Sequence, residues 1–98
     1  MRYFIVIEDR GPSWNRARSR PEQDKWAEHA TFMDALVEEG FVVLGGPFGD
    51  GVLVMLIVST DNEAQVERRL ADDPWIQMGI LTIASVQPWQ LLLGDAPS

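Results

Sequence analysis

The longest uninterrupted apolar run in this chain of 98 residues is "VLVMLIV", residues 52–58. It is rich in β-branched and other apolar residues and contains no glycine or proline, a composition typical of a β-strand. Its apolar residues are continuous and do not alternate with polar ones, which indicates a strand covered on both faces. The run "YFIVI", residues 3–7, has the same character. We therefore expect these two segments to be the central strands of one sheet.

The segments around these two runs predict the remaining elements. In chain order we expect a strand at 2–8, a loop at 9–21, a helix at 22–39, strands at 41–48 and 51–59, a helix at 61–71, a tight connection with one short helical turn at 72–79, and a strand at 80–89. Pro21 and Glu22 favour the start of the first helix, and Gly40 favours its end. The order β-α-β-β-α-β is that of the ferredoxin-like fold, an α+β class whose four-stranded antiparallel sheet has the spatial order 4-1-3-2.

The predicted sheet has one face that the chain cannot cover by itself. Two helices cover one side of a four-stranded sheet, yet the continuous apolar runs of the central strands indicate burial on both sides. A chain of this length has no further segment for the second side. The simplest solution is a second copy, packed sheet to sheet in a symmetric homodimer.

Composition and charge argue against several classes of function. The formal net charge is −7 and the pI is about 4.4, so neither a nucleic acid nor an anionic membrane is expected as a partner. The absence of cysteine excludes disulfides, thiol catalysis and thiolate metal sites. The amino-terminal apolar run is too short for a signal peptide, and nothing approaches a membrane span, so we expect a cytoplasmic protein. The length predicts one domain, residues 1–94, followed by a flexible tail at 95–98.

The only histidine, His29, falls on the apolar side of the first predicted helix. Trp26, His29, Met33 and Leu36 are spaced by three or four residues and therefore share one stripe. A lone histidine without cysteine is a poor metal site, and no serine lies in a nucleophile motif. Two hypotheses remain: a half-buried histidine with one structural hydrogen bond, or a general acid–base group oriented by a carboxylate.

Asp73 is the candidate carboxylate, because it lies in a connection beside Pro74 and Trp75 and not on a solvated helix face. An aspartate followed by proline is also a common start of a helical turn, with Asp as the N-cap and Pro at the first position. The sequence pattern leaves both roles open.

The tryptophans next to these two residues, Trp26 and Trp75, predict the walls of an apolar pocket with a few polar groups. The alternative is that they serve core and dimer packing. Gly45, Gly46 and Pro47 would let the backbone pass close to the pocket, and Phe48 would line it. These glycines lack the following helix of a phosphate loop, so no nucleotide site is predicted.

Three arginines alternate in the loop before the first helix: Arg16, Arg18 and Arg20. They could form a lid whose guanidinium groups hold a carboxylate or a phenolate, with Trp14 stacked on an aromatic ligand. A solvated surface loop is the alternative. The same spacing could serve RNA, but the net charge argues against it.

Several of these features occur together in the segments "HATFMDALVEEGFVVLGGPFGD" (29–50) and "ADDPWIQMGILTIASVQPWQ" (71–90). They are the histidine of the first helix, the Gly46-Pro47 pair, and the Asp73-Pro74-aromatic element before Gly79. In this combination the chain resembles the YCII-related domain family.

The resemblance implies a ferredoxin-like subunit assembled as a dimeric α/β barrel. It also implies a histidine–aspartate pair in a cleft, which corresponds here to His29 and Asp73. Family relatives and proteins of the same fold include an isomerase and a dehydrochlorinase of a chlorinated hydroxyquinol. Residues 10–20 look like an insertion relative to shorter family members.

These observations predict a small-molecule acid–base enzyme of the isomerase, dehydrochlorinase or hydrolase type, acting on a small anionic or aromatic metabolite. Proton transfer of this kind needs no redox cofactor, so we expect no cofactor and no metal. A non-catalytic metabolite-binding or accessory dimer module is the alternative, and a purely structural dimer is a third hypothesis.

Overall fold

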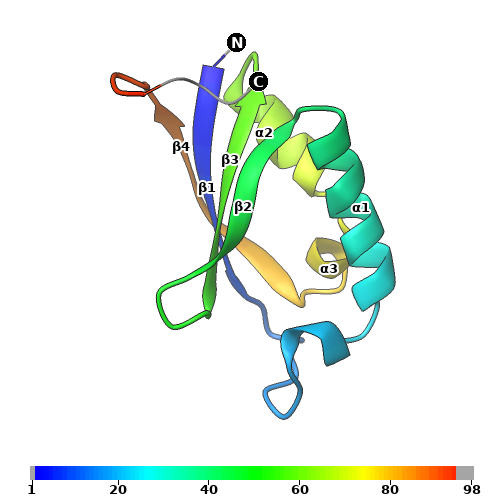
Figure 1. Ribbon diagram of the computed structural model, residues 1–98. Coiled ribbons are helices and arrows are strands. Elements are labelled where there is room, and N and C mark those ends of the chain that lie inside the picture. Colours follow the sequence, from blue (N-terminus) through cyan, green and yellow to red (C-terminus); the bar gives the residue numbers. More distant parts are fainter. Residues whose placement is uncertain (1, 95–98) are drawn as a thin grey trace.

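The computed structural model describes residues 2–94 as two layers, a twisted sheet and a set of helices packed on one side of it (Figure 1). In chain order the elements are β1 (Arg2–Arg10), the 3-10 helix η1 (Arg20–Glu22), α1 (Trp26–Glu38), β2 (Val42–Phe48), β3 (Leu53–Thr60), α2 (Glu63–Leu70), α3 (Pro74–Gln77) and β4 (Leu81–Trp89). The tail predicted at 95–98 lies outside the described residues. No helix in the described part of the chain is long and apolar enough to cross a membrane.

The four strands form one antiparallel sheet in the order β2-β3-β1-β4, which confirms the predicted ferredoxin-like α+β fold and its two central strands. The register pairs Val6 of β1 with Leu56 of β3 and with Val86 of β4. The pairing of β1 with β4 shifts between Ile7 and Glu8. Such a bulge bends a strand and re-aims its side chains, and this one lies directly before Glu8.

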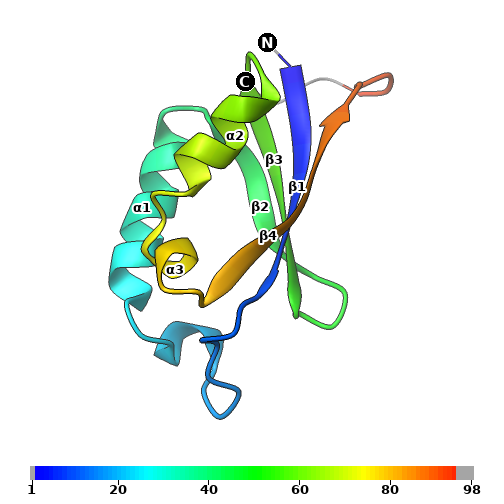
Figure 2. The same ribbon diagram turned by 180° about the vertical axis from the view of Figure 1, so that it is seen from behind.

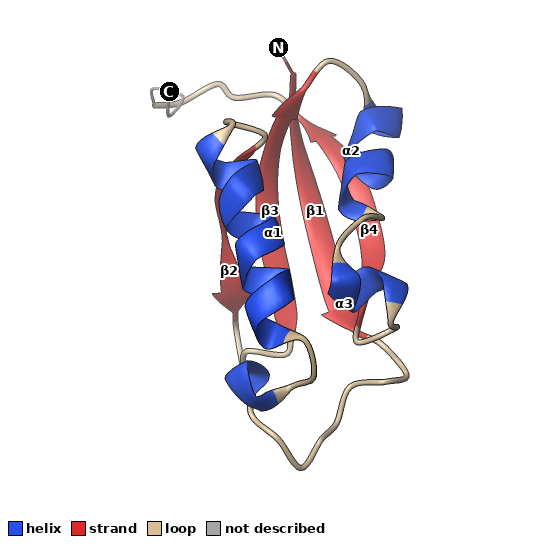
Figure 3. Ribbon diagram, turned by 90° about the vertical axis from the view of Figure 1, so that its right-hand side faces the viewer, coloured by secondary structure: helices blue, strands red, loops and turns tan. Residues whose placement is uncertain are grey.

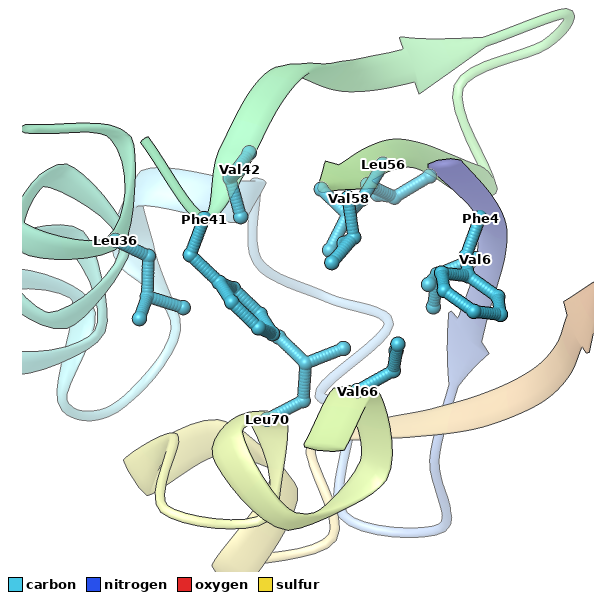
Figure 4. Packing of buried hydrophobic residues seen from close by; sticks show 10 residues of the cluster. Phe4, Val6, Leu36, Phe41, Val42, Leu56, Val58, Val66 and Leu70 are labelled. Carbon is cyan, nitrogen blue, oxygen red and sulfur yellow. The ribbon is translucent and has the colours of Figure 1, made fainter. Parts of the chain in front are cut away.

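The helices all lie on one face of the sheet, as the view from behind also shows (Figure 2). The main core forms between these layers, where Val66 and Leu70 of α2 are fully buried together with Phe4 and Val58 of the central strands. In Figure 4 the ring of Phe41, from the connection between α1 and β2, points toward Leu70. Close packing of this kind is the main source of the stability of the fold.

The other face of the sheet carries apolar side chains that no described element covers. Side chains alternate along a strand, so Ile5 of β1 and both Met55 and Ile57 of β3 point away from the helices, while their neighbours in the sequence are buried. The continuous apolar runs are therefore half-covered within one chain. The predicted homodimer concerns this face, and it stays a prediction.

The first helix begins four residues later than expected. Pro21 and Glu22 belong to η1, where the Glu22 carboxylate accepts hydrogen bonds from the backbone N–H of Ser19 at 3.0 Å and from its hydroxyl at 2.7 Å. Lys25 then adopts a left-handed φ of 62°, a conformation that an α-helix cannot contain, and α1 starts at Trp26. The start predicted at residue 22 was wrong because a capping pattern with proline fits a single 3-10 turn as well as a long helix.

The loop between β1 and η1 is held in place by one buried amide. The side chain of Gln23 is buried; its Nε2 donates to the carbonyl oxygens of Asn15 at 2.8 Å and Arg18 at 3.0 Å, and its Oε1 accepts from the backbone N–H of Asn15 at 2.9 Å. At the start of the loop, Gly11 passes so close to Gly79 that a Cβ atom would lie 2.1 Å from the Gly79 carbonyl oxygen. The loop is therefore anchored both to the segment before α1 and to the connection between α3 and β4.

Candidate active site

A pocket of about 240 Å³ lies between α1 and the sheet, and we name it the His29 pocket. Five of the residues predicted for the site line it: Arg20, Trp26, His29, Gly46 and Pro47. Figure 3 shows the short helix α3 beside the amino-terminal half of α1, at the same end of the molecule. A larger hollow of about 540 Å³ lies at the opposite end of β1, and Arg2 is the one charged residue among those that line it. Of these two hollows, the His29 pocket holds the richer chemistry.

His29 and Asp73 are in direct contact although they are 44 residues apart in the chain. The imidazole Nδ1 lies 2.9 Å from both carboxylate oxygens, and the two side chains are 11% and 0% exposed. A carboxylate only accepts hydrogen bonds, so Nδ1 carries the proton that bonds Asp73, and Nε2 of the neutral ring is the nitrogen with a free lone pair. Nε2 has no hydrogen-bond partner within residues 2–94.

Asp73 has a second role, because it is also the N-cap of α3. Its Oδ1 accepts a hydrogen bond of 2.9 Å from the backbone N–H of Trp75, and Pro74 occupies the first turn. The capping role and the histidine contact are therefore compatible in one residue. The cap fixes the rotamer of the carboxylate, and the carboxylate in turn fixes the plane of the imidazole ring.

Three tryptophans pack around the pair. The indole of Trp75 is fully buried and stacks on the imidazole of His29, with ring centroids 4.0 Å apart and planes 4° from parallel. Trp26 contacts both rings at centroid distances of 5.9 and 5.6 Å. Trp14 packs edge-on against Trp75 at 5.9 Å and does not line the His29 pocket; it lines a separate hollow together with Arg16. The Nε1–H of Trp75 donates to the carbonyl oxygen of Asp24 at 2.6 Å, which fixes the indole plane.

Of the three loop arginines, the structure brings Arg20 to the pocket. Its guanidinium donates to the carbonyl oxygen of Gly51 at 3.2 Å and lies over the ring of Trp14, 5.2 Å from its centroid. Arg16 and Arg18 are exposed and do not line the pocket, and Arg18 pairs with Asp24 at 3.3 Å.

Backbone geometry separates the three predicted residues of β2. Pro47 pairs with Val54, whose buried side chain lines the pocket, whereas Phe48 pairs with Leu53 and falls on the other face of the strand. The structure therefore does not bring Phe48 to the pocket. Gly45 does line it, and a Cβ there would lie 2.7 Å from Leu56, so the missing side chain keeps space in the pocket.

The pocket also holds a residue that sequence reasoning missed, Glu8. Its side chain is 1% exposed, and its Oε2 is buried without a hydrogen-bond partner in the described part of the chain. Burial, and next the nearby Asp73, raise the pKa of Glu8 to about 7, against the opposing effect of the Arg20 cation. Glu8 stands in phase with Phe4 and Val6 on β1, and that alternation could have placed it on the buried face.

No group of three or more histidine, cysteine, aspartate or glutamate side chains within residues 2–94 is placed to hold a metal ion. The chemical groups that line the pocket are the oriented imidazole of His29, the buried carboxyl of Glu8, the exposed carboxyl of Asp34 and the guanidinium of Arg20. These groups can transfer protons and bind an anion.

Comparisons with known proteins agree with this geometry at the level of the fold. One solved structure with this fold is 5-chloro-2-hydroxyhydroquinone dehydrochlorinase from Burkholderia phenoliruptrix in complex with 2,5-dihydroxybenzoquinone; its TM-score is 0.60, with 20% identity over 96% of each chain. No curated protein sequence matches the chain. The model of the YCII-related domain matches residues 1–90, and the chain therefore belongs to the YCII-related domain family.

Proposed function

We propose that the chain is an acid–base enzyme that binds a small anionic or aromatic metabolite in the His29 pocket and moves a proton with His29. The observation that carries the proposal is the contact of Nδ1 with both oxygens of Asp73, because it leaves Nε2 as a proton acceptor on a residue that lines the pocket.

The proton-transfer step follows from this arrangement. A C–H or O–H bond of the bound molecule breaks, its electron pair stays on the molecule, and its proton moves to Nε2 of His29. The resulting imidazolium is stabilised by the Asp73 carboxylate at 2.9 Å, and stacking on Trp75 keeps the ring in place. A positioned base of this kind typically contributes about a hundredfold to ten-thousandfold in rate.

The lining of the pocket favours a small, flat and anionic substrate. Arg20 supplies a guanidinium for a carboxylate or phenolate, and Trp26 supplies an aromatic wall. The volume of about 240 Å³ suits a single-ring compound. The structural neighbour is named for a chlorinated hydroxyquinol and binds a dihydroxybenzoquinone, which supports compounds of this class. Isomerisation, elimination of chloride and hydrolysis can all use such a step.

A thermal-shift screen with 2,5-dihydroxybenzoquinone, phenolic acids, lactones and halogenated aromatics tests the proposal. We expect stabilisation by at least one compound, because a ligand that binds only the folded state raises the melting temperature. Turnover of that compound should be lost in His29→Ala and in Asp73→Asn, and both variants should stay folded. A ligand that binds without turnover would make the protein a binding module, and no stabilising compound would favour a structural dimer.

We also propose that a second copy of the chain covers the open face of the sheet. Ile5, Met55 and Ile57 place apolar side chains there, which favours an identical apolar face as the partner. Met55→Lys should convert a dimer into monomers or aggregates, as measured by sedimentation velocity, whereas the control Met78→Lys on the exposed end of α3 should stay dimeric. A wild-type protein that sediments as a folded monomer would contradict this assembly.

A further inference from the structure

Glu8 is a buried carboxyl group that the proton transfer by His29 does not use. It follows the bulge of β1, lines the same pocket as His29 and is 1% exposed. Its Oε2 has no hydrogen-bond partner among residues 2–94. Buried carboxyl groups are normally paired, because an unsatisfied one lowers the stability of the fold. An unpaired carboxyl at the edge of a pocket is therefore better explained by a partner that arrives with the ligand.

The charged groups that face Glu8 come from three elements. Arg20 of η1 lies close enough to favour its ionised form, and Asp73 before α3 favours its neutral form. His29 and Asp34 of α1 line the same pocket. The strands β2, β3 and β4 contribute no titratable side chain. Both an anion, Asp73, and a cation, Arg20, are thus close enough to Glu8 to affect its charge, so its proton can be given and recovered.

We propose that Glu8 is the second proton-transferring group of the His29 pocket and gives a proton to the bound molecule while His29 takes one. This inference rests on the proposed function and narrows it to one class of ligand. That class is a molecule with an enolisable carbonyl, such as a hydroxyquinone, which can accept a proton at one atom and release a proton from another.

The exchange of protons balances without any further reactant. The O–H bond of the Glu8 carboxyl breaks, and its proton forms a bond to an enolate carbon or oxygen of the ligand. A C–H or O–H bond elsewhere in the ligand breaks, and that proton moves to Nε2 of His29. Glu8 is then a carboxylate and His29 an imidazolium, and a proton returns from the imidazolium to Glu8 through water or the product. The ligand is isomerised, with no gain or loss of electrons.

The electrostatics of the site support this role. Burial, and next the charge of Asp73, raise the pKa of Glu8 to about 7, against the opposing effect of Arg20. A group with that pKa is protonated often enough near neutral pH to act as an acid, and it regains its proton readily afterwards. An exposed glutamate would be ionised under the same conditions.

The first experiment measures the titration of Glu8 in the wild-type protein. Carboxyl carbons are labelled with ¹³C, the Glu8 signal is assigned by its loss in Glu8→Gln, and its shift is followed from pH 3 to pH 9. We expect a midpoint near 7, against a value near 4.5 for an unperturbed glutamate. A midpoint near 4.5 would overturn the proposal. If Glu8→Gln does not fold, through-bond correlation in the wild-type protein assigns the same signal.

The second experiment follows the exchange of the ring hydrogens of 2,5-dihydroxybenzoquinone for deuterium in D₂O by ¹H NMR. This exchange needs one acid that donates to a ring carbon and one base that removes a proton from it. We expect the wild-type protein to accelerate the exchange, with a rate that declines above pH 7 as Glu8 loses its proton. In Glu8→Gln the exchange should be at least about a hundredfold slower, and its rate should not decline above pH 7. The control Glu67→Gln, an exposed acid on α2, should exchange at the wild-type rate.

The variants separate failure of this inference from failure of the proposed function. Wild-type exchange rates in Glu8→Gln, together with slow exchange in His29→Ala, would overturn the role of Glu8 and leave the role of His29 intact. Wild-type rates in His29→Ala would overturn both. No acceleration by the wild-type protein would overturn this inference, and the thermal-shift screen would then decide the proposed function.

Discussion

The two buried clusters of this molecule differ in the polar groups they contain. The apolar cluster between the sheet, α1 and α2 is made of aliphatic and phenylalanine side chains. The tryptophan cluster at the other end consists of Trp14, Trp75, Ile80 and Leu81. The buried polar or charged residues of the described chain are Glu8, Gln23 and Asp73. Each of them belongs to the tryptophan end, because Gln23 holds the loop of Trp14, Asp73 caps the helix of Trp75, and Glu8 lines the pocket of Trp26.

The two clusters therefore have different roles. Burial of apolar side chains stabilises a fold without specifying any chemistry. Burial of a polar group costs free energy unless the group is paired. A fold therefore retains buried polar groups where they hold a loop, a helix start or a site residue in place. Substitutions in the apolar cluster should therefore change stability, and substitutions at the tryptophan end should change activity.

The largest expected effect is that of His29→Ala on turnover. Removal of the imidazole should lower kcat about a hundredfold to ten-thousandfold, which is the usual contribution of a positioned general base. The ring is 11% exposed, and its loss should leave the far-ultraviolet circular dichroism spectrum unchanged. The measurement is kcat for the compound that the thermal-shift screen identifies.

A substitution in the apolar cluster provides the matched control. Leu70→Ala removes a fully buried side chain and should lower the free energy of unfolding by about 2–5 kcal/mol. Activity per folded molecule should stay at the wild-type value. If Leu70→Ala abolished turnover in folded protein, the two clusters would not be functionally separate.

The next effect is a dependence of stability on pH that Glu8 introduces. Its pKa is about 7 in the folded state and near 4.5 in the unfolded chain, so the folded state binds the proton more tightly. Its contribution is fully present below pH 4.5 and is lost as the pH rises to about 7, at about 1.4 kcal/mol for each pH unit, or roughly 3 kcal/mol in total. Urea unfolding at pH 5 and pH 8 measures this loss.

Glu8→Gln should remove most of that slope and be more stable than wild type at pH 8, since it buries a neutral amide of the same shape. Leu70→Ala should keep the wild-type slope, because it changes no titratable group. An unchanged slope in Glu8→Gln would mean that other groups cause it.

The fold was largely predictable because the two central strands are marked by continuous apolar runs, and their positions determine the order of the sheet. The start of α1 could not be predicted, because the sequence carries no pattern for the left-handed backbone of Lys25. The same holds for the bulge before Glu8, which depends on the pairing of β1 with β4.

For the site, helical spacing placed His29 on the inner side of α1, and the pattern before Pro74 placed Asp73 at a helix start. Their contact, however, joins segments 44 residues apart, and the residues alone left it open; it came from the resemblance. Glu8 was overlooked because a glutamate at the end of a predicted strand is usually solvated, although its phase with Val6 pointed inward.

The smallest expected effect separates the arginines of the loop. Arg20→Ala should weaken binding of an anionic ligand about tenfold to a hundredfold, since a charge-assisted hydrogen bond is lost, and should affect the neutral amide of the same compound much less. Arg18→Ala, which breaks an exposed pair with Asp24, should change binding of neither compound. Isothermal titration calorimetry with the two compounds checks this, and equal losses for both would argue against an anion contact at Arg20.

Proton transfer by His29 depends on the tautomer of its ring, and a single spectrum reports that tautomer. Because His29 is the only histidine, a two-bond ¹H–¹⁵N correlation spectrum of labelled protein above pH 8 contains the signals of one ring. The account predicts a protonated Nδ1 and an unprotonated Nε2, with the preference weakened in Asp73→Asn. A ring protonated on Nε2, with Nδ1 bare beside Asp73, would contradict it.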